Sequence, residues 1–396
     1  MRILTISNLF PRPDQPFRGM YNLRLFTALQ ALGHEVLHLC LVPVSNPLRF
    51  EGVRRWRAPD RVTFPTCYAP YWHVPVVGRS TAWRMCQTSL QHFSSMASDF
   101  RPDVLFGSWL YPDGVAAGAW ARSLGVPYGL MVLGSDTFHL NSGREARIVR
   151  ACGQAAAVIC VAEALRNRLV EAGVAAQRLH VVPNGVDTSL FHFRSREDAI
   201  ARLSQTAASP PDFSKMTVLF VGNLVPIKGP DRMLDAWLQI VGKRPDAGYR
   251  LVFLGDGPMR RRLQRQVQRQ GIGDCVCFLG SRPPEEVAWW MNAAEMLCLT
   301  SHSEGMPNVV LEALASGLPV VATDVGGVRQ MLHDEPAGRV IERQATTAEL
   351  AQSVLECLQR PVDRALVAKR NAERASWRNG AEQIVRHLLG PPNEPV

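Results

Sequence analysis

Short apolar runs alternate with amphipathic stretches along most of the chain. In the first half the apolar runs predict strands at Arg2–Ser7, Glu35–Leu41, Val104–Phe106, Tyr128–Leu133, Ala155–Val161 and His180–Pro183. Apolar positions at helical spacing predict helices at Tyr21–Leu32, Gly114–Ser123 and Ala164–Glu171. Because strands alternate with helices, we expect a parallel sheet.

The same alternation starts again after a polar connector over residues 188–216, which holds one predicted helix, Glu197–Ser204. The second series predicts strands at Thr217–Val221, Arg250–Leu254, Val276–Phe278, Met296–Thr300 and Pro319–Thr323, and helices at Asp231–Val241, Met259–Gln270, Pro284–Asn292, Leu366–Ala375 and Gly380–Leu389. A chain of 396 residues is too long for one ordinary core. The sequence therefore predicts an α/β protein of two domains.

Two glutamates stand eight positions apart in the segment that carries most information about function. Glu304 ends a polar loop after a predicted strand, and Glu312 lies inside a predicted helix whose first turn suits Pro307. We expect Glu304 at the mouth of this helix and Glu312 about two turns further on. Free N–H groups of a helix N-terminus lie between them and favour an anionic group such as a diphosphate.

Two carboxylates at such a spacing are also compatible with a capping acid and a solvated helix residue. The neighbouring segment argues for a site, because Asp324–Val328 contains two glycines and opens another helix after the next strand. Gly-rich turns at the ends of adjacent strands are typical of a nucleotide crevice in an open α/β sheet.

Several further motifs occur in a fixed order along nearly the whole chain. They are Gly-His-Glu-Val at 33–36, Tyr-Pro-Asp-Gly at 111–114, Val-Pro-Asn-Gly-Val-Asp at 182–187, Val-Gly-Asn-Leu-Val-Pro-Ile-Lys-Gly at 221–229 and Gly-Asp-Gly-Pro at 255–258. Together with the Glu304/Glu312 pair, this order resembles the retaining nucleotide-sugar glycosyltransferases of family 4.

The resemblance implies the GT-B fold, in which two Rossmann-like domains with parallel sheets face a central cleft. It implies an N-terminal acceptor domain over 1–187, completed by a C-terminal helix at 380–390, and a donor domain over 188–379. It also implies transfer of a sugar from a nucleoside diphosphate sugar, with UDP preferred over GDP, by a hexosyltransferase-type enzyme.

The resemblance assigns roles to individual residues of this chain. Glu304 would hold the donor sugar and Glu312 the ribose, assisted by the backbone at Gly305, Met306, Pro307 and Asn308. Lys228, one of four lysines in the protein, would neutralise the leaving diphosphate as a point charge. Gly19, with Arg18 and Arg24 near it, matches the loop that meets the phosphates. Arg282 matches a segment that contacts the base, whereas Gly255–Pro258 is interpreted as a structural turn.

The chain departs from the family pattern at three positions. Asn223 stands where an arginine usually joins the lysine, so another arginine is expected to replace it. Leu133 and Phe106 stand where histidines are usual, and neither can act as an acid or base. Asp136 becomes the candidate to hold an acceptor hydroxyl, with Asp113 behind it, although a helix-capping aspartate is an equal alternative.

Charge and cysteine content bear on the partners. Residues 1–185 hold 19 arginines and 11 acids, a balance of +8 out of +9 for the whole chain. The arginines at 54, 55, 57 and 61, with Trp56, Phe64, Tyr68, Tyr71 and Trp72, suit a membrane interface or an acceptor pocket, and a solvated loop is equally compatible. Nine scattered cysteines favour reduced thiols.

These observations predict a cytoplasmic glycosyltransferase, with peripheral attachment at the inner face of the membrane. Its expected partners are a nucleotide-sugar donor, a glycan or polyprenyl-diphosphate-linked acceptor and an anionic membrane surface, without nucleic acid. No cofactor and no metal are expected, because the sequence has no Asp-x-Asp motif near the donor site. A sugar-nucleotide epimerase and a non-catalytic nucleotide-sugar binding subunit are the two alternatives.

Overall fold

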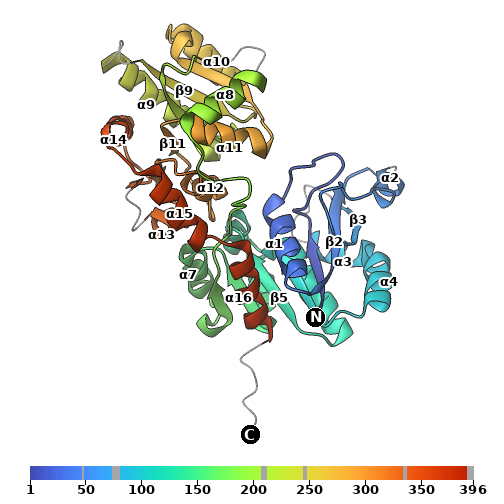
Figure 1. Ribbon diagram of the computed structural model, residues 1–396. Helices are drawn as coiled ribbons and strands as arrows, with labels where there is room; N and C mark the ends of the chain where they lie inside the picture. Colours follow the sequence, from blue (N-terminus) through green and yellow to red (C-terminus); the bar gives the residue numbers. More distant parts are fainter. Residues whose placement is uncertain (47–48, 74–80, 207–211, 244–247, 333–336, 390–396) are drawn as a thin grey trace. The chain divides into compact units, whose positions relative to one another are not determined.

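The computed structural model describes residues 1–46, 49–73, 81–206, 212–243, 248–332 and 337–389. Two compact units make up the chain (Figure 1). The first unit consists of Met1–Gly185 and Trp377–Val396, and the second unit of Val186–Ser376. Each unit is built around one parallel sheet.

The sheet of the first unit has seven strands in the order β3-β2-β1-β4-β5-β6-β7. All neighbouring strands run parallel. The strands are β1 (Arg2–Ser7), β2 (Glu35–Val44), β3 (Thr66–Trp72), β4 (Val104–Ser108), β5 (Tyr128–Val132), β6 (Ala157–Cys160) and β7 (Leu179–Val181). Almost every residue of the central strands is buried, as expected for a parallel sheet covered on both faces.

The helices of the first unit are α1 (Met20–Ala31), α2 (Phe50–Arg54), α3 (Thr81–Thr88), α4 (Leu90–Phe100), α5 (Val115–Leu124), α6 (Glu145–Gln154), α7 (Glu163–Glu171) and α16 (Trp377–Leu389), with short turns η3 (Leu110–Gly114), η4 (Ser135–Asn141) and η5 (Ala176–Arg178). The last helix, α16, packs against α1 and β6. A methyl group on Gly129 would lie 2.2 Å from Leu388, so the glycine makes room for this helix. The predicted return of the last helix to the first unit is confirmed.

The sheet of the second unit has six parallel strands in the order β10-β9-β8-β11-β12-β13. Their bounds are β8 (Met216–Val221), β9 (Tyr249–Leu254), β10 (Val276–Gly280), β11 (Met296–Leu299), β12 (Val320–Thr323) and β13 (Gly338–Ile341). The hydrophobic core of this unit contains Phe220 of β8, Phe253 of β9 and Trp237, which lies between β8 and β9 in sequence.

The helices of the second unit are α8 (Arg196–Thr206), α9 (Pro230–Lys243), α10 (Arg260–Arg269), α11 (Pro284–Ala293), α12 (Asn308–Ala315), α13 (Val328–Leu332), α14 (Thr347–Gln359) and α15 (Arg364–Arg374), with short turns η6 (Pro226–Lys228) and η7 (Gly273–Cys275). Of these, α14 packs on α9, α11 on α8, and α12 on α15.

Both sheets share one strand order when strands are counted from the start of each unit. The order reverses between β1 and β4 in the first unit and between β8 and β11 in the second. In open α/β sheets, ligands bind outside the carboxyl ends of the two strands at such a switch point. The loops after β1, β4, β8 and β11 are therefore the places to look for a site.

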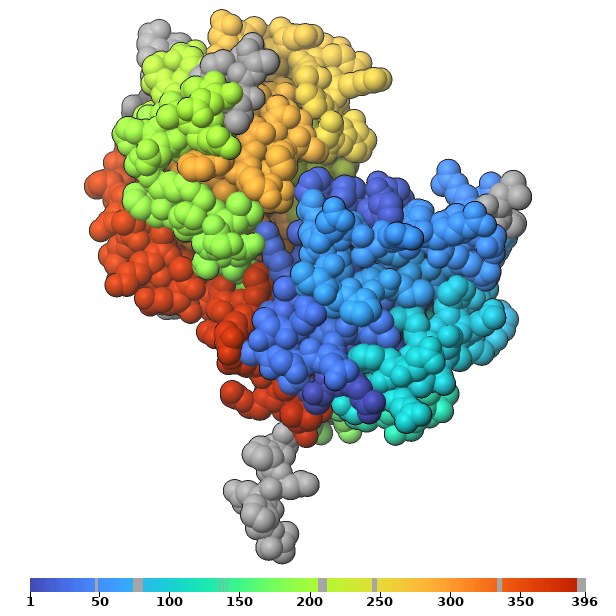
Figure 2. All heavy atoms as spheres, turned by 45° about the vertical axis from the view of Figure 1, so that its right-hand side comes forward, coloured from blue at the N-terminus to red at the C-terminus, as the bar shows by residue number. Residues whose placement is uncertain are grey.

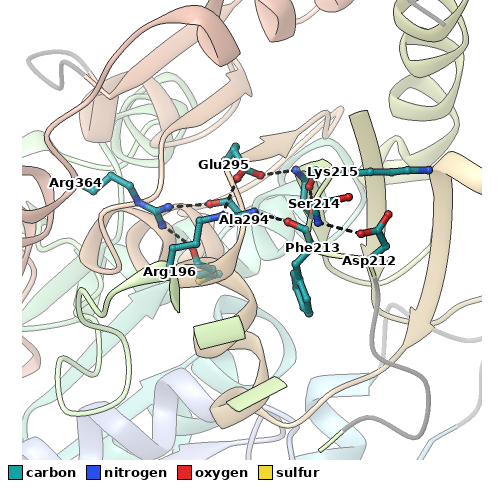
Figure 3. A network of polar contacts seen from close by, with 10 residues as sticks. Arg196, Asp212, Phe213, Ser214, Lys215, Ala294, Glu295 and Arg364 are labelled. Carbon is teal, nitrogen blue, oxygen red and sulfur yellow. Dashed lines mark hydrogen bonds and ion pairs between the residues drawn. The ribbon is translucent and has the colours of Figure 1, made fainter. Parts of the chain in front are cut away.

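At the amino ends of strands of the second sheet, one half-buried carboxylate and two arginines tie several elements together (Figure 3). Glu295 accepts hydrogen bonds from the backbone N–H of Thr217 and from Arg196 Nε, the latter at 3.0 Å. Arg364 donates to the carbonyls of Ala294 (2.9 Å), Met291 (2.8 Å) and Gly317 (3.1 Å). These carbonyls lie at the C-terminal ends of α11 and α12, where a cation is favoured.

Part of the expectation for the arginine- and aromatic-rich segment is wrong. Phe64, Tyr68 and Tyr71 are 3%, 2% and 3% exposed. Tyr68 and Tyr71 belong to the buried part of strand β3, and Phe64 precedes that strand. These three rings cannot reach a membrane or line an open acceptor pocket. The arginines at 54, 55, 57 and 61 are exposed.

Candidate functional site

An ion pair lies at the switch point of the second sheet. The Lys228 ammonium is 2.7 Å from each carboxylate oxygen of Glu304, and Ser301 donates its hydroxyl to Glu304 Oε1 at 2.6 Å. The Glu304 side chain is 9% exposed and that of Lys228 31%. Lys228 follows β8 and Ser301 follows β11, so residues 73 and more positions apart meet where the strand order reverses.

Backbone contacts fix the two loops that carry this pair. Gly229 has φ +62°, and a side chain there would place its first carbon 2.3 Å from the Thr300 carbonyl. The Thr300 hydroxyl in turn donates to the Gly229 carbonyl at 2.7 Å, and Thr323 donates to the Ser301 carbonyl at 2.6 Å. The loops after β8, β11 and β12 are thus held as one framework around Glu304.

The two glycine-containing turns that the sequence placed side by side do lie in contact. Gly327 N–H donates to the Gly305 carbonyl at 2.7 Å. Gly326 has φ +56°, and a methyl group on it would lie 2.1 Å from that carbonyl and 2.6 Å from the Glu304 carbonyl. Only glycine permits this approach, so Gly326 fixes the backbone that bears Glu304.

Helix α12 begins later than the sequence suggested. Pro307 is the N-cap residue rather than part of the first turn, so Glu312 lies only about one turn into the helix. Met306 and Pro307 are buried, whereas Asn308 and Glu312 are half-buried. A ligand at this helix N-terminus would therefore meet the backbone of 305–308 and the side chains of Asn308 and Glu312.

The remaining predicted donor residues of the second unit lie at the same edge of the sheet. Asn223 is exposed in the loop after β8, and Arg282 is exposed after β10, where it pairs with Glu286 at 2.9 Å. Gly255 and Gly257 pack against the backbone of the loop after β8. A methyl group added to Gly255 would lie 2.0 Å from the Gly222 carbonyl oxygen, and one added to Gly257 would lie 2.5 Å from that of Leu224. The 255–258 turn therefore supports the backbone of the loop after β8.

Other arginines at this edge already have partners inside the unit. Arg232 donates to the carbonyls of Thr300 and Ala345, Arg260 pairs with Asp256, and Arg329 with Asp324. An arginine was expected to take the place of the family arginine that Asn223 replaces. None of these three arginines is unpaired, so none of them is available for that role without losing its present partner.

The switch point of the first sheet also carries a polar pair. Asp113, in η3 after β4, is fully buried and accepts from the Asn8 N–H (2.7 Å) and the Asn8 side-chain amide (2.9 Å). Burial raises the pKa of Asp113 to about 8, while the Asn8 hydrogen bond and the Arg18 charge lower it. Arg18 donates to the Asn8 carbonyl at 3.2 Å.

Gly19 caps α1 with φ +61°, and an added methyl group would lie 2.1 Å from the Leu9 carbonyl. The packing of the chain on itself thus explains the glycine. Its predicted contact with a phosphate stays a prediction.

Asp136 is fully buried and bound to backbone. Its carboxylate accepts N–H groups from Leu133 (3.2 Å), Gly134 (2.8 Å) and Leu110 (3.2 Å), and thereby joins the ends of β4 and β5. Burial raises its pKa. This geometry favours the structural alternative, and the catalytic role stays a prediction.

Sequence reasoning missed two residues of these sites. Ser301 directly follows a predicted strand, and its place at a strand end could have indicated it. His139, in η4, supplies an imidazole three positions after Asp136 and six after Leu133, where the family usually has a histidine. Its Nδ1 lies 2.6 Å from Arg144 Nη1, and burial, together with this cation, lowers its pKa.

Metal-binding clusters and membrane-spanning helices are both absent from the described residues. Within the described ranges, no three His, Cys, Asp or Glu side chains come together as a metal site. In the same part of the chain, no helix has both the length and the apolar character needed to cross a bilayer.

Comparison with known proteins agrees with the geometry. The model of the family "Glycosyl transferases group 1" matches residues 215–360, and that of "Glycosyl transferase 4-like domain" matches residues 19–185. The chain is 29% identical over 347 residues to a teichuronic acid biosynthesis glycosyltransferase, TuaC, of Bacillus subtilis, covering 84% of this chain and 83% of that protein. It is 34% identical over 218 residues to a D-inositol 3-phosphate glycosyltransferase of Segniliparus rotundus, covering 53% and 46%.

Solved structures share the fold. A sucrose-phosphate synthase from Thermosynechococcus elongatus aligns with a TM-score of 0.75 at 20% identity, over 97% of both chains. HepE of Anabaena, solved with UDP-glucose, aligns with a TM-score of 0.74 at 19% identity, over 98% and 99%. The fold and the matches define a glycosyltransferase with the GT-B fold. The chain belongs to the family 4 glycosyltransferases.

Proposed function

We propose that this glycosyltransferase moves a hexose from a nucleoside diphosphate sugar, UDP in preference to GDP, to a glycan or lipid-linked acceptor, with retention of configuration. The observation that carries the proposal is the Lys228–Glu304 pair at the switch point of the second sheet, beside the N-terminus of α12. A basic group, a carboxylate and the N-terminus of a helix, all at the carboxyl ends of the strands, suit a diphosphate joined to a sugar.

Each group then has a task. Lys228 and the N-terminus of α12 neutralise the charge that develops on the departing diphosphate. Glu304 holds the donor sugar, and Glu312 accepts hydrogen bonds from the ribose hydroxyls. Because protein groups supply this charge, transfer proceeds without a metal ion.

In the proposed step, the bond between the anomeric carbon and the phosphate oxygen breaks, and the acceptor oxygen bonds that carbon on the same face. The leaving phosphate oxygen takes the acceptor proton, so no covalent sugar–enzyme intermediate forms. Glu304 is already bound to Lys228 and Ser301. A carboxylate with these donors is better suited to stabilising positive charge at the sugar than to attacking it.

We place the reaction in the assembly of a bacterial surface polysaccharide. Support comes from TuaC, a relative named for teichuronic acid biosynthesis that aligns over 84% of this chain. The UDP-glucose complex of HepE supports a uridine nucleotide as the carrier. The exposed arginines at 54, 55, 57 and 61 support peripheral attachment to the anionic inner face of the membrane.

The test is a panel of UDP- and GDP-sugars with EDTA present, scored for nucleoside diphosphate release and for sugar products. Release that increases with added acceptor glycan supports transfer. Interconversion of the nucleotide sugars without release would identify an epimerase, and binding without either reaction would identify a non-catalytic subunit. Loss of activity in EDTA with rescue by manganese would overturn metal independence.

A further inference from the structure

A cavity of about 350 Å³ lies in the first unit, at the carboxyl end of β2. The last residues of β2, the loop after β1 and helix α2 line it. The polar and aromatic side chains of the lining are Arg12, Asp14, Ser45, Asn46, Arg49 and Trp56. Helix α2, in mid-blue, lies at the surface of the first unit (Figure 2). The volume falls at the lower end of the range for small-molecule sites and suits one or two sugar rings.

One part of the cavity wall, around Arg12 and Trp56, is built from side chains that are already held in place. Arg12 is 6% exposed, and Asp14 binds it through two bonds, Nε–Oδ1 at 3.0 Å and Nη2–Oδ2 at 3.2 Å. The Arg12 guanidinium lies 5.8 Å from the centre of the Trp56 ring. Trp56 packs edge to face on Tyr68 at 5.8 Å, and the Tyr68 hydroxyl donates to the Pro11 carbonyl at 2.6 Å. A ligand would need to order little of this part of the wall.

The chemistry of the wall suits a saccharide. A half-buried indole offers a flat apolar face with negative charge density, which attracts the weakly positive C–H groups of a sugar ring. Buried Val42, Val44 and Val53 back the cavity. Asn46 and Asp14 supply amide and carboxylate groups that can bind hydroxyls at the rim.

The charge of the wall favours an acidic sugar. Asp14 offsets Arg12, whereas the side chain of Arg49 has no ion-pair or hydrogen-bond partner among the residues that the structure describes. One positive charge is left over at the rim, and a guanidinium binds carboxylate and phosphate in a two-point geometry. A neutral sugar would not neutralise the charge of the Arg49 guanidinium.

We propose that this cavity is an acceptor subsite for an acidic sugar residue, bearing a carboxylate or a phosphate, stacked on Trp56 and bound by Arg49. The inference rests on the proposed transferase function, because it takes the occupant to be the acceptor glycan.

The experiment measures binding to the full chain by calorimetry and by saturation-transfer NMR. The probes are a disaccharide containing a uronic acid, the matching neutral disaccharide and a hexose phosphate. The variants are Trp56→Leu and Arg49→Gln. The matched controls are Trp83→Leu, at a tryptophan that is 62% exposed, and Arg150→Gln, at an exposed arginine of α6.

We expect the acidic probes to bind the wild-type protein more tightly than the neutral one. Arg49→Gln should weaken them by about tenfold or more, the loss expected for one charge-assisted hydrogen bond. Trp56→Leu should weaken acidic and neutral probes alike, and the controls should bind as the wild type does. Comparison of the uronate with the phosphate identifies the acidic group.

Equal affinity for acidic and neutral probes, or equal losses in the controls, would overturn the proposal. Binding of nucleotide sugar to the wild-type protein is measured on the same preparation. Saccharide binding without nucleotide-sugar binding overturns the proposed function; the cavity is then a saccharide site, but not an acceptor subsite. If the protein binds nucleotide sugar and transfers the sugar, but Arg49→Gln leaves the acceptor KM unchanged, the proposed subsite is wrong and the proposed function stands.

Discussion

The Lys228 ammonium lies 2.7 Å from both carboxylate oxygens of Glu304. The sequence assigned these residues separately, one to the diphosphate and one to the sugar. Because they bind each other at the switch point, each fixes the position of the other, and a donor substrate must meet the two as a unit.

The first prediction concerns this pair. Lys228→Ala and Glu304→Ala should each lower turnover by about 10²-fold to 10³-fold, and the double variant should lose little more, because groups that act as a unit are not additive. Each single variant should lose about 1–3 kcal/mol of unfolding free energy, between the values for exposed and buried pairs. Steady-state kinetics and urea unfolding measure both quantities.

Arg329→Ala is the control, since it breaks an exposed ion pair with Asp324 at the same edge of the sheet. It should change stability less than either variant of the central pair. Losses of turnover that multiply in the double variant would show that Lys228 and Glu304 act independently.

The second prediction concerns the turn beneath Glu304. Gly326→Ala should abolish nucleotide-sugar binding, because its methyl group would lie 2.1 Å from the Gly305 carbonyl and displace the loop. Gly271→Ala is matched to it, with φ +66° against +56° but nothing within 4 Å. The control should cost about 1–2 kcal/mol for the left-handed backbone and leave binding intact. Equal effects of the two variants on binding would contradict the structural role of Gly326.

The third prediction concerns α16. His180 of β7 and His387 of α16 stack with ring centres 3.8 Å apart, and Arg166 and Arg386 are the cations near them. Burial and these neighbouring groups lower the pKa of both histidines. At low pH the folded protein therefore binds fewer protons than the unfolded chain does. The contribution of the two neutral histidines to the free energy of unfolding is present above about pH 6.5 and is lost as the pH falls below that value.

Urea unfolding between pH 5 and 8 measures this effect. His387→Phe should reduce the loss of stability toward low pH, whereas His192→Gln, at an exposed histidine of the second unit, should leave it unchanged. An unaltered pH dependence in His387→Phe would show that other groups cause it.

The fourth prediction concerns Arg364. Its guanidinium binds three backbone carbonyls at the ends of α11 and α12, and burial lowers its pKa to about 10. Arg364→Lys keeps the charge but cannot reach all three acceptors, so it should cost about 3 kcal/mol of unfolding free energy. Arg360→Lys, at an exposed position, should cost nothing measurable in the same thermal or urea unfolding experiment. Equal unfolding free energies of Arg364→Lys and Arg360→Lys would show that the contacts of Arg364 do not stabilise the second unit.

The central strands were predictable because they are buried on both faces and read as unbroken apolar runs. Strand β3 was missed because Pro65 and Pro70 interrupt its pattern, and the sheet tolerates Pro70 because β3 is an edge strand. The short edge strand β13 was missed as well.

Spacing along the chain indicated Glu304 and Glu312, which share one loop and helix. The contact of Glu304 with Lys228 was not predictable, because it depends on β8 and β11 becoming neighbours although β9 and β10 lie between them in sequence. The same applies to Asn8 and Asp113 in the first unit, which are 105 positions apart.

The most direct test of the account is a calorimetric titration of UDP and of uridine into the wild-type protein, Lys228→Ala and Glu312→Gln. If the donor site lies at the switch point of the second sheet, Lys228→Ala should weaken UDP by about tenfold or more and leave uridine unchanged, because the lysine meets only the diphosphate. Glu312→Gln should weaken both ligands, because it meets the ribose. Unchanged affinity of UDP for both variants would place the nucleotide elsewhere and contradict the account.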